Sequence, residues 1–575
     1  MKKNNSLKVL SSLIGVSGAI LLTSNLVQAE EGSSNQSATQ STETVVSDKN
    51  EVTAATQSVP TIDGATTTQE TAGISEVNNP NINYIKVDET LPLTSETYKR
   101  KTATELATMV REKKVTPEEL VELAFAEIEK QEAELNALIT DKKENGLVEA
   151  KARALEEAKN LVDTGQPFLG VPLILKGLGH GIAGGDASNG LYYNGNNTSR
   201  GDGTYTRDFK TLGFIPIAQS NYPEYGYRNN TNSYLFGSSR NPWDLSLNSG
   251  GSSGGSAAAI ASGMVPVASA SDSGGSIRIP ASWTGLVGYK PSRSAFRTEN
   301  TSITSHFPIT KSVEDAITLY NYYKEKQLKN DSANFSKDTN LKDYKIAYTT
   351  KSPMGTDVDP EAVEAVLNQV GFLKSQGFIV EEVEFPVNGR ELMRDYTYTM
   401  IGGAVSLPRN VDKTKLDPIT YGMARVRANL TAAKLGLPPI SLIKYETIMS
   451  EFHEKYPILL TPTNAHIADK AESWGITEED KERVLNIDSL PLADQVRLMV
   501  NQWEPMLRRT PFTQVFNISG GASISLPTHI SDSSFPFGTM YSVKKGDDNI
   551  LLNLAKYLED NKQLILKSEI AKKIQ

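Results

Sequence analysis

Apolar and polar positions follow two different patterns along this chain. From about residue 102 the spacing is helical: Thr102 and Glu105 form a capping pair, and Thr116 followed by Pro117 begins the next helix. A third helix is expected at 144–160, and apolar runs of strand length follow at 169–175, 211–220, 264–270 and 286–289. Apolar runs separated by helical stretches predict an α/β fold, with a large mixed, mostly parallel central sheet covered by helices on both faces.

The second half of the chain continues this alternation. Further strands are expected at 345–349, 379–384, 457–463 and 522–527, and helices at 360–376 and from about 547. The region 390–510 is predicted to be mainly helical. The pattern contains no internal repeat, so residues 84–575 are expected to form one large domain with an inserted or appended helical portion.

The first 83 residues have a different character. Residues 1–29 read as a secretory signal, with a basic start, an apolar run from Val9 to Leu22 and a cleavage site near Ala29. An uncleaved membrane anchor is the alternative, but the apolar run is short and interrupted. Residues 30–83 lack aromatic side chains and predict a disordered Ser/Thr/Gln/Glu-rich spacer. We therefore expect a secreted protein, extracellular or loosely wall-associated, without a stable membrane anchor.

The composition of the chain excludes several kinds of catalytic and metal-binding site. The chain has 575 residues, no cysteine and a formal net charge of −9. Thiol catalysis and Cys-based metal sites are excluded, and the acidic balance disfavours general nucleic-acid binding. The five histidines have no metal-ligand spacing. Neither a metal nor an organic cofactor is expected.

Two glycine-serine clusters carry the candidate chemistry. They span 250–255 and 273–276, and the Ala-rich segment between them indicates that they are buried. Buried Gly beside Ser suggests a site built from backbone N–H groups and hydroxyls. Residues 250–254 also fit the G-x-S-x-G nucleophile elbow, but no hydrophobic strand precedes them, which disfavours that interpretation.

Lys176 is a candidate base for these serines. It ends the apolar run 169–175 and has no carboxylate directly beside it. The pKa of an unperturbed lysine is about 10.4, so the side chain must be desolvated to be neutral near pH 7. From the local sequence alone, a lysine that ends a strand and points to water is the simpler interpretation.

The same segments resemble the amidase signature family. The resemblance rests on the two clusters, on Lys176, and on the flanking segments Asn221–Tyr225, Phe236–Trp243 and Gly285–Pro291, and it covers about 100–562. In general character the chain is similar to secreted bacterial amidases of the 6-aminohexanoate-cyclic-dimer hydrolase type. Departures are Gly177, where many members have Asp, and Trp283, where smaller residues are common.

The resemblance implies a Ser–Ser–Lys triad, with Ser276 as nucleophile, Ser252 as bridging serine after a cis peptide bond, and Lys176 as base. It also implies an oxyanion hole and a set of supporting residues. The oxyanion hole is matched to the backbone N–H groups of Ser273, Gly274, Gly275 and Ser276, and the supporting residues are Ser253, Asp272 and Arg278.

The expected function is a secreted amidase that hydrolyses a carboxylic amide C–N bond through an acyl-enzyme. Its partner is a small-molecule or peptide-like amide substrate. An amidotransferase A subunit is disfavoured because a signal peptide would separate it from cytoplasmic tRNA. A catalytically weak or inert surface binding protein that keeps the amidase fold is the alternative from a different functional class.

Overall fold

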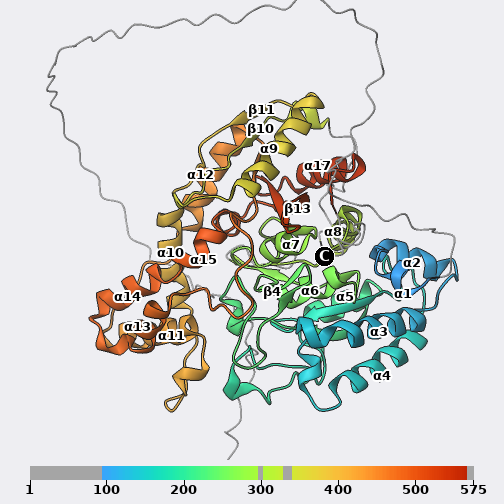
Figure 1. Cartoon of the computed structure of the whole chain (residues 1–575), viewed down its shortest axis with the longest axis horizontal. Coiled ribbons are helices and arrows are strands. Elements are labelled where there is room, and N and C mark those ends of the chain that lie inside the picture. Colours follow the sequence, from blue (N-terminus) through green and yellow to red (C-terminus); the bar gives the residue numbers. More distant parts are fainter. Residues whose placement is uncertain (1–92, 296–301, 328–339, 566–575) are drawn as a thin grey trace, which may run out of the picture. The chain divides into compact units, whose positions relative to one another are not determined.

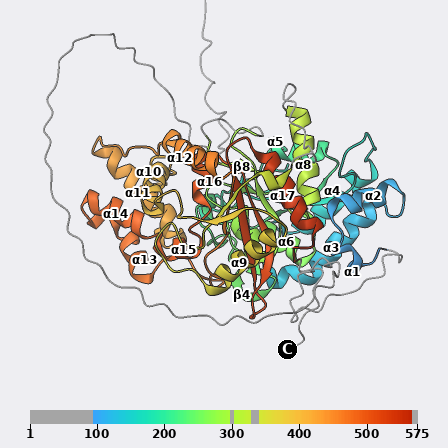
Figure 2. The same cartoon turned by 90° about the horizontal axis from the view of Figure 1, so that it is seen from above.

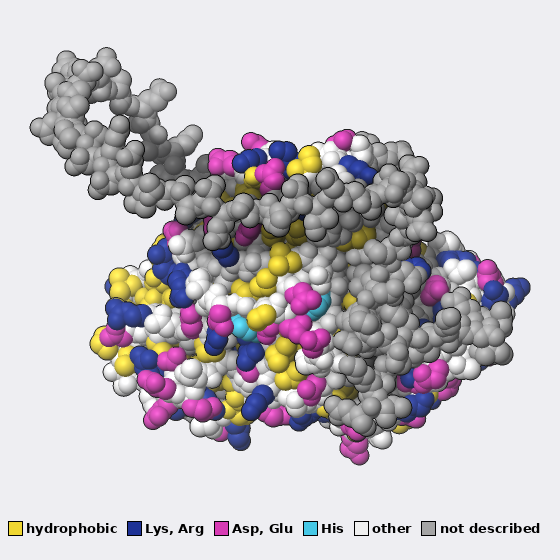
Figure 3. Space-filling model, turned by 45° about the horizontal axis from the view of Figure 1, so that its top comes forward, with side chains coloured by type: hydrophobic (Ala, Val, Ile, Leu, Met, Phe, Trp, Pro, Cys, Tyr) yellow, Lys and Arg dark blue, Asp and Glu magenta, His cyan; other side chains and the backbone are white. Residues whose placement is uncertain are grey.

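The computed structural model describes residues 93–295, 302–327 and 340–565 (Figure 1). The predicted signal segment 1–29 and spacer 30–83 lie outside the described residues. Within the described ranges, no helix combines the length and apolar character needed to cross a membrane. Acidic and basic side chains are interspersed over the face drawn in Figure 3.

The N-terminal helices begin where the capping signals predict. Thr102 Oγ1 accepts from the N–H of Glu105 at 3.2 Å, and the Glu105 carboxylate accepts from the N–H of Thr102 at 2.8 Å. Thr116 and Glu119 form the same reciprocal pair. Both capping boxes satisfy N–H groups that a helix start leaves without partners. The first helices are α1 (Ser95–Tyr98), α2 (Ala103–Arg111), α3 (Pro117–Leu135) and α4 (Gly146–Lys159).

Two larger sheets form the centre. The first has the order β2-β1-β5-β9, and the second has the order β11-β10-β12-β14-β13-β7. The strands of the first sheet are β1 (Pro172–Lys176), β2 (Ile215–Ser220), β5 (Val267–Ala268) and β9 (Ile309–Thr310). Those of the second are β7 (Gly288–Lys290), β10 (Ile346–Tyr348), β11 (Val380–Glu382), β12 (Ile458–Pro462), β13 (Ser523–Ile530) and β14 (Pro536–Val543).

A backbone bridge joins the two sheets. Val287 and Thr310 exchange both of their N–H···O bonds, at 3.0 and 3.2 Å, beside the edge strands β7 and β9. The sheets therefore continue into one another, as expected for a large mixed sheet. The expectation of mostly parallel pairing is wrong. Strand β1 is parallel to β2 and β5, and β10 to β11 and β12, but the pairs β5–β9, β12–β14, β13–β14 and β13–β7 are antiparallel.

Helices cover both faces of the second sheet, which confirms the α/β class. A Cβ on Gly538 of β14 would point at Ser282 of α7 (Arg278–Thr284), whereas Tyr541 of the same strand bonds Gln369 of α9 (Pro360–Ser375). Positions 538 and 541 differ by an odd number, so their side chains leave opposite faces of the strand. Helix α6 (Gly254–Ser262) packs on β1, β2, β5 and β9 of the first sheet.

The region 390–510 is mainly helical, as predicted. Helix α11 (Pro418–Ala432) packs against α13 (Glu478–Leu485) and α14 (Leu492–Asn501), and Figure 2 shows the three together. The other helices are α5 (Thr204–Thr211), α8 (Val313–Gln327), α10 (Gly389–Gly402), α12 (Leu442–Lys455), α15 (Glu504–Arg509), α16 (Gln514–Ser519) and α17 (Asp548–Asp560). Two short pairs, β3 (Arg240–Asn241) with β4 (Asp244–Asn248) and β6 (Ser271–Asp272) with β8 (Ser305–His306), complete the strands.

Candidate active site

Lys176 lies at the carboxyl end of β1 and is fully buried. Its Nζ bonds Ser252 Oγ at 2.8 Å and Ser271 Oγ at 3.0 Å. The interpretation of a lysine that ends a strand and points to water is therefore wrong. The β6 segment beside it and the turn before α6 close over the amine and remove it from solvent.

Burial lowers the pKa of Lys176 to about 7, and the attraction of Asp272 opposes this shift only in part. Lys290 is also buried, and burial likewise lowers its pKa to about 7. However, Lys290 Nζ donates to two carbonyls, those of Pro291 at 2.9 Å and Gly521 at 2.6 Å. Contact with a serine hydroxyl, and not the pKa, distinguishes Lys176 as the candidate base.

Ser252 follows a cis peptide bond at Gly251–Ser252 and lies just before α6. A Cβ on Gly251 would lie 2.7 Å from the carbonyl carbon of Asn230, so this position has no room for a side chain. Ser276 lies at the end of the second cluster, two residues before α7, and is 6% exposed. Within the described residues, Ser276 Oγ makes no hydrogen bond.

The loop 273–276 offers backbone N–H groups. Those of Ser273, Gly274 and Ser276 have no acceptor in the part of the chain that the structure describes. Gly275 differs from the prediction because its N–H already donates to Asp272 Oδ1 at 2.6 Å. A Cβ on Gly275 would lie 2.3 Å from Thr513 Oγ1, and its φ of +132° favours glycine. The loop therefore presents three free donors, with the fourth used to fix its shape.

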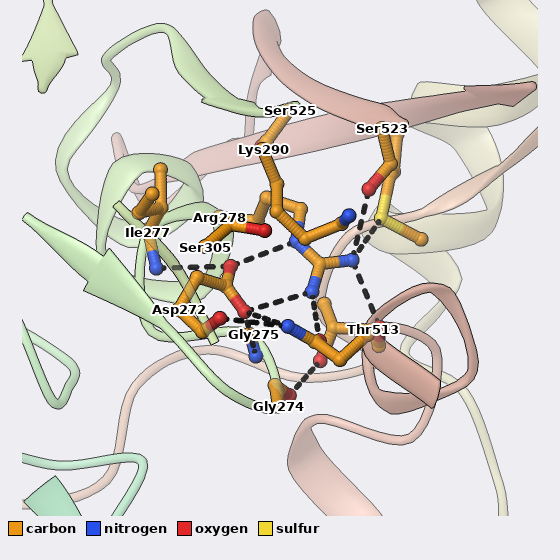
Figure 4. Close-up of polar contacts among 12 residues, drawn as sticks. Asp272, Gly274, Gly275, Ile277, Arg278, Lys290, Ser305, Thr513, Ser523 and Ser525 are labelled. Atoms are coloured by element: carbon orange, nitrogen blue, oxygen red, sulfur yellow. Dashed lines mark hydrogen bonds and ion pairs between the residues drawn. The ribbon is translucent and has the colours of Figure 1, made fainter. Parts of the chain in front are cut away.

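Asp272 and Arg278 form a fully buried ion pair behind this loop (Figure 4). The Asp272 carboxylate accepts from Arg278 Nε at 2.9 Å and Nη2 at 3.0 Å, and from the N–H of Ile277 at 3.1 Å. Asn517 Nδ2 of α16 adds a further bond at 2.9 Å. Burial acts to raise the pKa of Asp272, but Arg278 and these donors hold it well below its usual range. The pair thus connects the loop to α7 and α16.

Arg278→Met is expected to lower the free energy of unfolding by about 3–5 kcal/mol, because it leaves the buried Asp272 charge without its partner. Denaturant unfolding measures the effect. Arg390→Met is the matched control, since Arg390 pairs with Glu504 at the exposed surface and its loss is expected to cost less than about 1 kcal/mol. Equal losses in the two variants would contradict the structural role given to Arg278.

Several contacts in the site were not predicted from the sequence. Ser271 bonds Lys176, Thr513 Oγ1 donates to the Gly274 carbonyl at 2.7 Å, and Tyr396 OH donates to the Ser273 carbonyl at 3.3 Å. Ser253, one of the supporting residues that the resemblance implies, donates from its Oγ to the Ser271 carbonyl at 3.3 Å. Ser271 stands directly before Asp272 in the chain, and this adjacency is the signal that could have identified it.

The structure explains both departures from the family pattern. A Cβ on Gly177 would lie 2.4 Å from the Tyr222 ring and 2.6 Å from Ile139, so a larger residue does not fit there. Trp283 is 2% exposed and donates from Nε1 to the His466 carbonyl at 2.9 Å.

This arrangement suits acyl transfer. An amine of lowered pKa contacts one serine hydroxyl, and a second serine lies at a loop with free N–H donors. Among the described residues, no histidine hydrogen-bonds to Ser252 or Ser276. His180 lies behind Lys176 instead: its Nδ1 is 2.6 Å from Ser269 Oγ, and that oxygen accepts the backbone N–H of Lys176 at 2.8 Å.

Comparison with known proteins gives a consistent result. Residues 119–552 match the family described as Amidase. The chain is 38% identical over 534 residues to a lipoamidase of Enterococcus faecalis, which covers 91% of this chain and 71% of that protein. It is 29% identical over 481 residues to the putative amidase AmiC of Mycobacterium tuberculosis, covering 80% of this chain and 94% of that protein.

Solved structures share the fold. A 6-aminohexanoate cyclic dimer hydrolase complexed with substrate superposes with a TM-score of 0.66 at 23% identity, over 80% of this chain and 97% of that chain. A bacterial aryl acylamidase of the amidase signature family superposes with a TM-score of 0.64 at 23% identity, over 81% of this chain and 97% of that chain.

Proposed function

This chain belongs to the amidase family and is a hydrolase of amide C–N bonds, and we propose that it is secreted and works through an acyl-enzyme on Ser276. The observation that carries the proposed mechanism is the 2.8 Å contact between Lys176 Nζ and Ser252 Oγ in a buried site. An amine whose pKa is about 7 is largely neutral above that pH and accepts a proton from a neighbouring hydroxyl.

In the proposed reaction Lys176 takes the proton of Ser252, and Ser252 takes that of Ser276. Ser276 Oγ attacks the amide carbon and forms a tetrahedral intermediate. Its oxyanion accepts hydrogen bonds from the N–H groups of Ser273, Gly274 and Ser276. The proton returns through Ser252 to the leaving amine as the C–N bond breaks. Water, deprotonated by the same relay, then hydrolyses the ester and restores the Ser276 hydroxyl.

We propose an amide with an apolar acyl group as the substrate class, with lipoamide as the first compound to test. The relative at 38% identity is named a lipoamidase. The chain also brings aromatic side chains to the site. A Cβ on Gly226 would lie 3.0 Å from Ser252 Oγ, the flanking Tyr225 and Tyr227 rings stack at 5.6 Å, and Tyr396 bonds the loop at Ser273.

Labelling with a fluorophosphonate probe tests the mechanism and the location together. Protein recovered from the culture medium of the producing cells is treated with the probe, digested and mapped. We expect the label on Ser276 and a first residue near Glu30, because Ser276 is the proposed nucleophile and residues 1–29 the proposed signal.

Two outcomes would contradict the proposals separately. An unlabelled Ser276, in protein that also leaves lipoamide and aryl amides intact while a control amidase reacts, would favour the inert surface binding protein. Protein that stays with the cells and keeps residues 1–29 would contradict secretion without touching the mechanism.

A further inference from the structure

A cavity of about 500 Å³ lies apart from the proposed triad. It is formed by α8, α12, the ends of α16 and β14, the start of α17 and the segment after β7. Helices α12 and α16 pack side by side there (Figure 2). None of Lys176, Ser252 and Ser276 lines it. The residues that matter for its chemistry are Arg293, Glu446, His453, Ser519, Lys544 and Lys545.

Three of these residues hold buried polar atoms without partners. Among the described residues, Arg293 Nε, His453 Nε2 and Ser519 Oγ have no hydrogen-bond partner, although the three residues are only 5%, 4% and 2% exposed. Buried polar atoms are nearly always paired, because an unpaired one costs about 1–3 kcal/mol. Three residues with such atoms line this one cavity, so a molecule bound there would supply the missing partners.

The unpaired atoms define what that partner must offer. His453 Nδ1 lies 3.0 Å from the Tyr456 carbonyl, which only accepts, so Nδ1 carries the proton. Burial lowers the pKa of His453 to about 4, and the ring is therefore neutral with Nε2 as an acceptor. Arg293 Nε is a donor. A bound molecule must thus carry both an acceptor and a hydrogen to donate.

The charged side chains that line the cavity favour the binding of an anion. Glu446 is shared by Arg293, at 3.4 Å, and Lys545, at 3.0 Å. Lys544 is half-buried and has no ion-pair or hydrogen-bond partner for its Nζ among the described residues. The other carboxylate, Asp548, is already engaged by the Tyr289 hydroxyl and the N–H of Ser292. Lys324 of α8 also lines the cavity, so positive charge exceeds negative charge in the lining.

We propose that this cavity binds a small anion, a phosphate or a carboxylate, that also carries a hydroxyl or amino hydrogen. Its charged oxygens lie against Lys544 and Arg293, and its hydrogen points to His453 Nε2. This site is separate from the proposed amide site, because its lining and the triad share no residue.

Isothermal titration of the full chain tests the proposal with three probes at constant ionic strength. Inorganic phosphate and malate each carry both a charged oxygen and a hydroxyl hydrogen, whereas sulfate at neutral pH has no hydrogen. We expect phosphate or malate to bind at least about tenfold more tightly than sulfate. The probe that binds shows whether the ligand's charge comes from a phosphate or from a carboxylate group.

Substitutions in the lining test whether the probes bind in this cavity. Lys544→Gln is expected to weaken the preferred probe by about tenfold or more, and His453→Phe to abolish the preference over sulfate. Lys545→Gln provides a second test if either variant has a lowered melting temperature. Lys345→Gln is the matched control, because Lys345 pairs with Glu381 outside the cavity.

The proposal would be overturned if neither phosphate nor malate bound at about 10 mM, a concentration at which even weak small-molecule binding is detected. Unchanged binding in Lys544→Gln would also overturn it. The titration does not depend on amide hydrolysis. Its failure is therefore distinct from a failure of the acyl-enzyme mechanism.

Discussion

Ser276→Ala is expected to lower kcat by at least about 10⁴-fold, because loss of a serine nucleophile costs up to about 10⁶-fold in comparable enzymes. The melting temperature is expected to stay near that of the wild type. Ser276 Oγ makes no hydrogen bond within the described residues, so its removal breaks none. Steady-state hydrolysis of lipoamide or an aryl amide measures kcat, and calorimetry measures the melting temperature.

Ser262→Ala is the matched control for this variant. Ser262 is also a buried serine, at the end of α6, and its Oγ donates to the Ala259 carbonyl at 3.1 Å. We expect it to retain wild-type kcat. A Ser276→Ala protein that hydrolyses amides at the wild-type rate would show that another residue attacks the carbonyl.

Lys176→Met is expected to lower kcat/KM by about 10²–10⁴-fold at pH 8, the range contributed by one positioned acid–base group. The wild-type pH profile gives the sharper test. Burial lowers the pKa of Lys176 to about 7, so the neutral form that accepts a proton increases as pH rises through 7. We expect kcat/KM of the wild type to rise from pH 5 through pH 7 and to level off above about pH 8, on the scale set by that pKa.

Lys290→Met provides the control for the pH profile. Its amine is as deeply buried, and burial lowers its pKa to about the same value, but among the described residues it donates to carbonyls and to no serine hydroxyl. The rise through pH 7 is expected to persist in this variant. Loss of the rise in Lys290→Met, together with its retention in Lys176→Met, would reverse the assignment of the base.

The pattern of apolar and capping residues predicted those helices and strands whose ends are marked in the local sequence. The capping boxes at Thr102 and Thr116 set helix starts to the residue, and the apolar run before Lys176 became β1. Strand β14 was missed, because Pro536 and Gly538 interrupt its apolar pattern and imitate a turn. The antiparallel pairing of β12, β14 and β13 was missed for another reason. Pairing depends on which segments meet in space, and an apolar run does not encode its neighbour's direction.

The part of the site that lies within the family's sequence motifs was predictable. The resemblance brought together Lys176, Ser252 and Ser276, and the structure places the first two in direct contact. Thr513 and Asn517 contact the loop from more than two hundred residues downstream. A single Thr or Asn in that region belongs to no motif from which this contact could be predicted. The role of the Gly275 N–H depends on the loop conformation. That conformation follows from Asp272 and Thr513 together.

The position of Ser252 just before α6 has an electrostatic consequence. The peptide dipoles of this helix add up to a partial positive charge at its N-terminus, where Lys176 Nζ meets Ser252 Oγ. That field favours a serine alkoxide and disfavours an ammonium group, so it lowers the proton affinity of the lysine in the same direction as burial does. A base held in such a field gives its proton back readily. The helix that supports proton removal from the serine therefore also supports proton delivery to the departing amine.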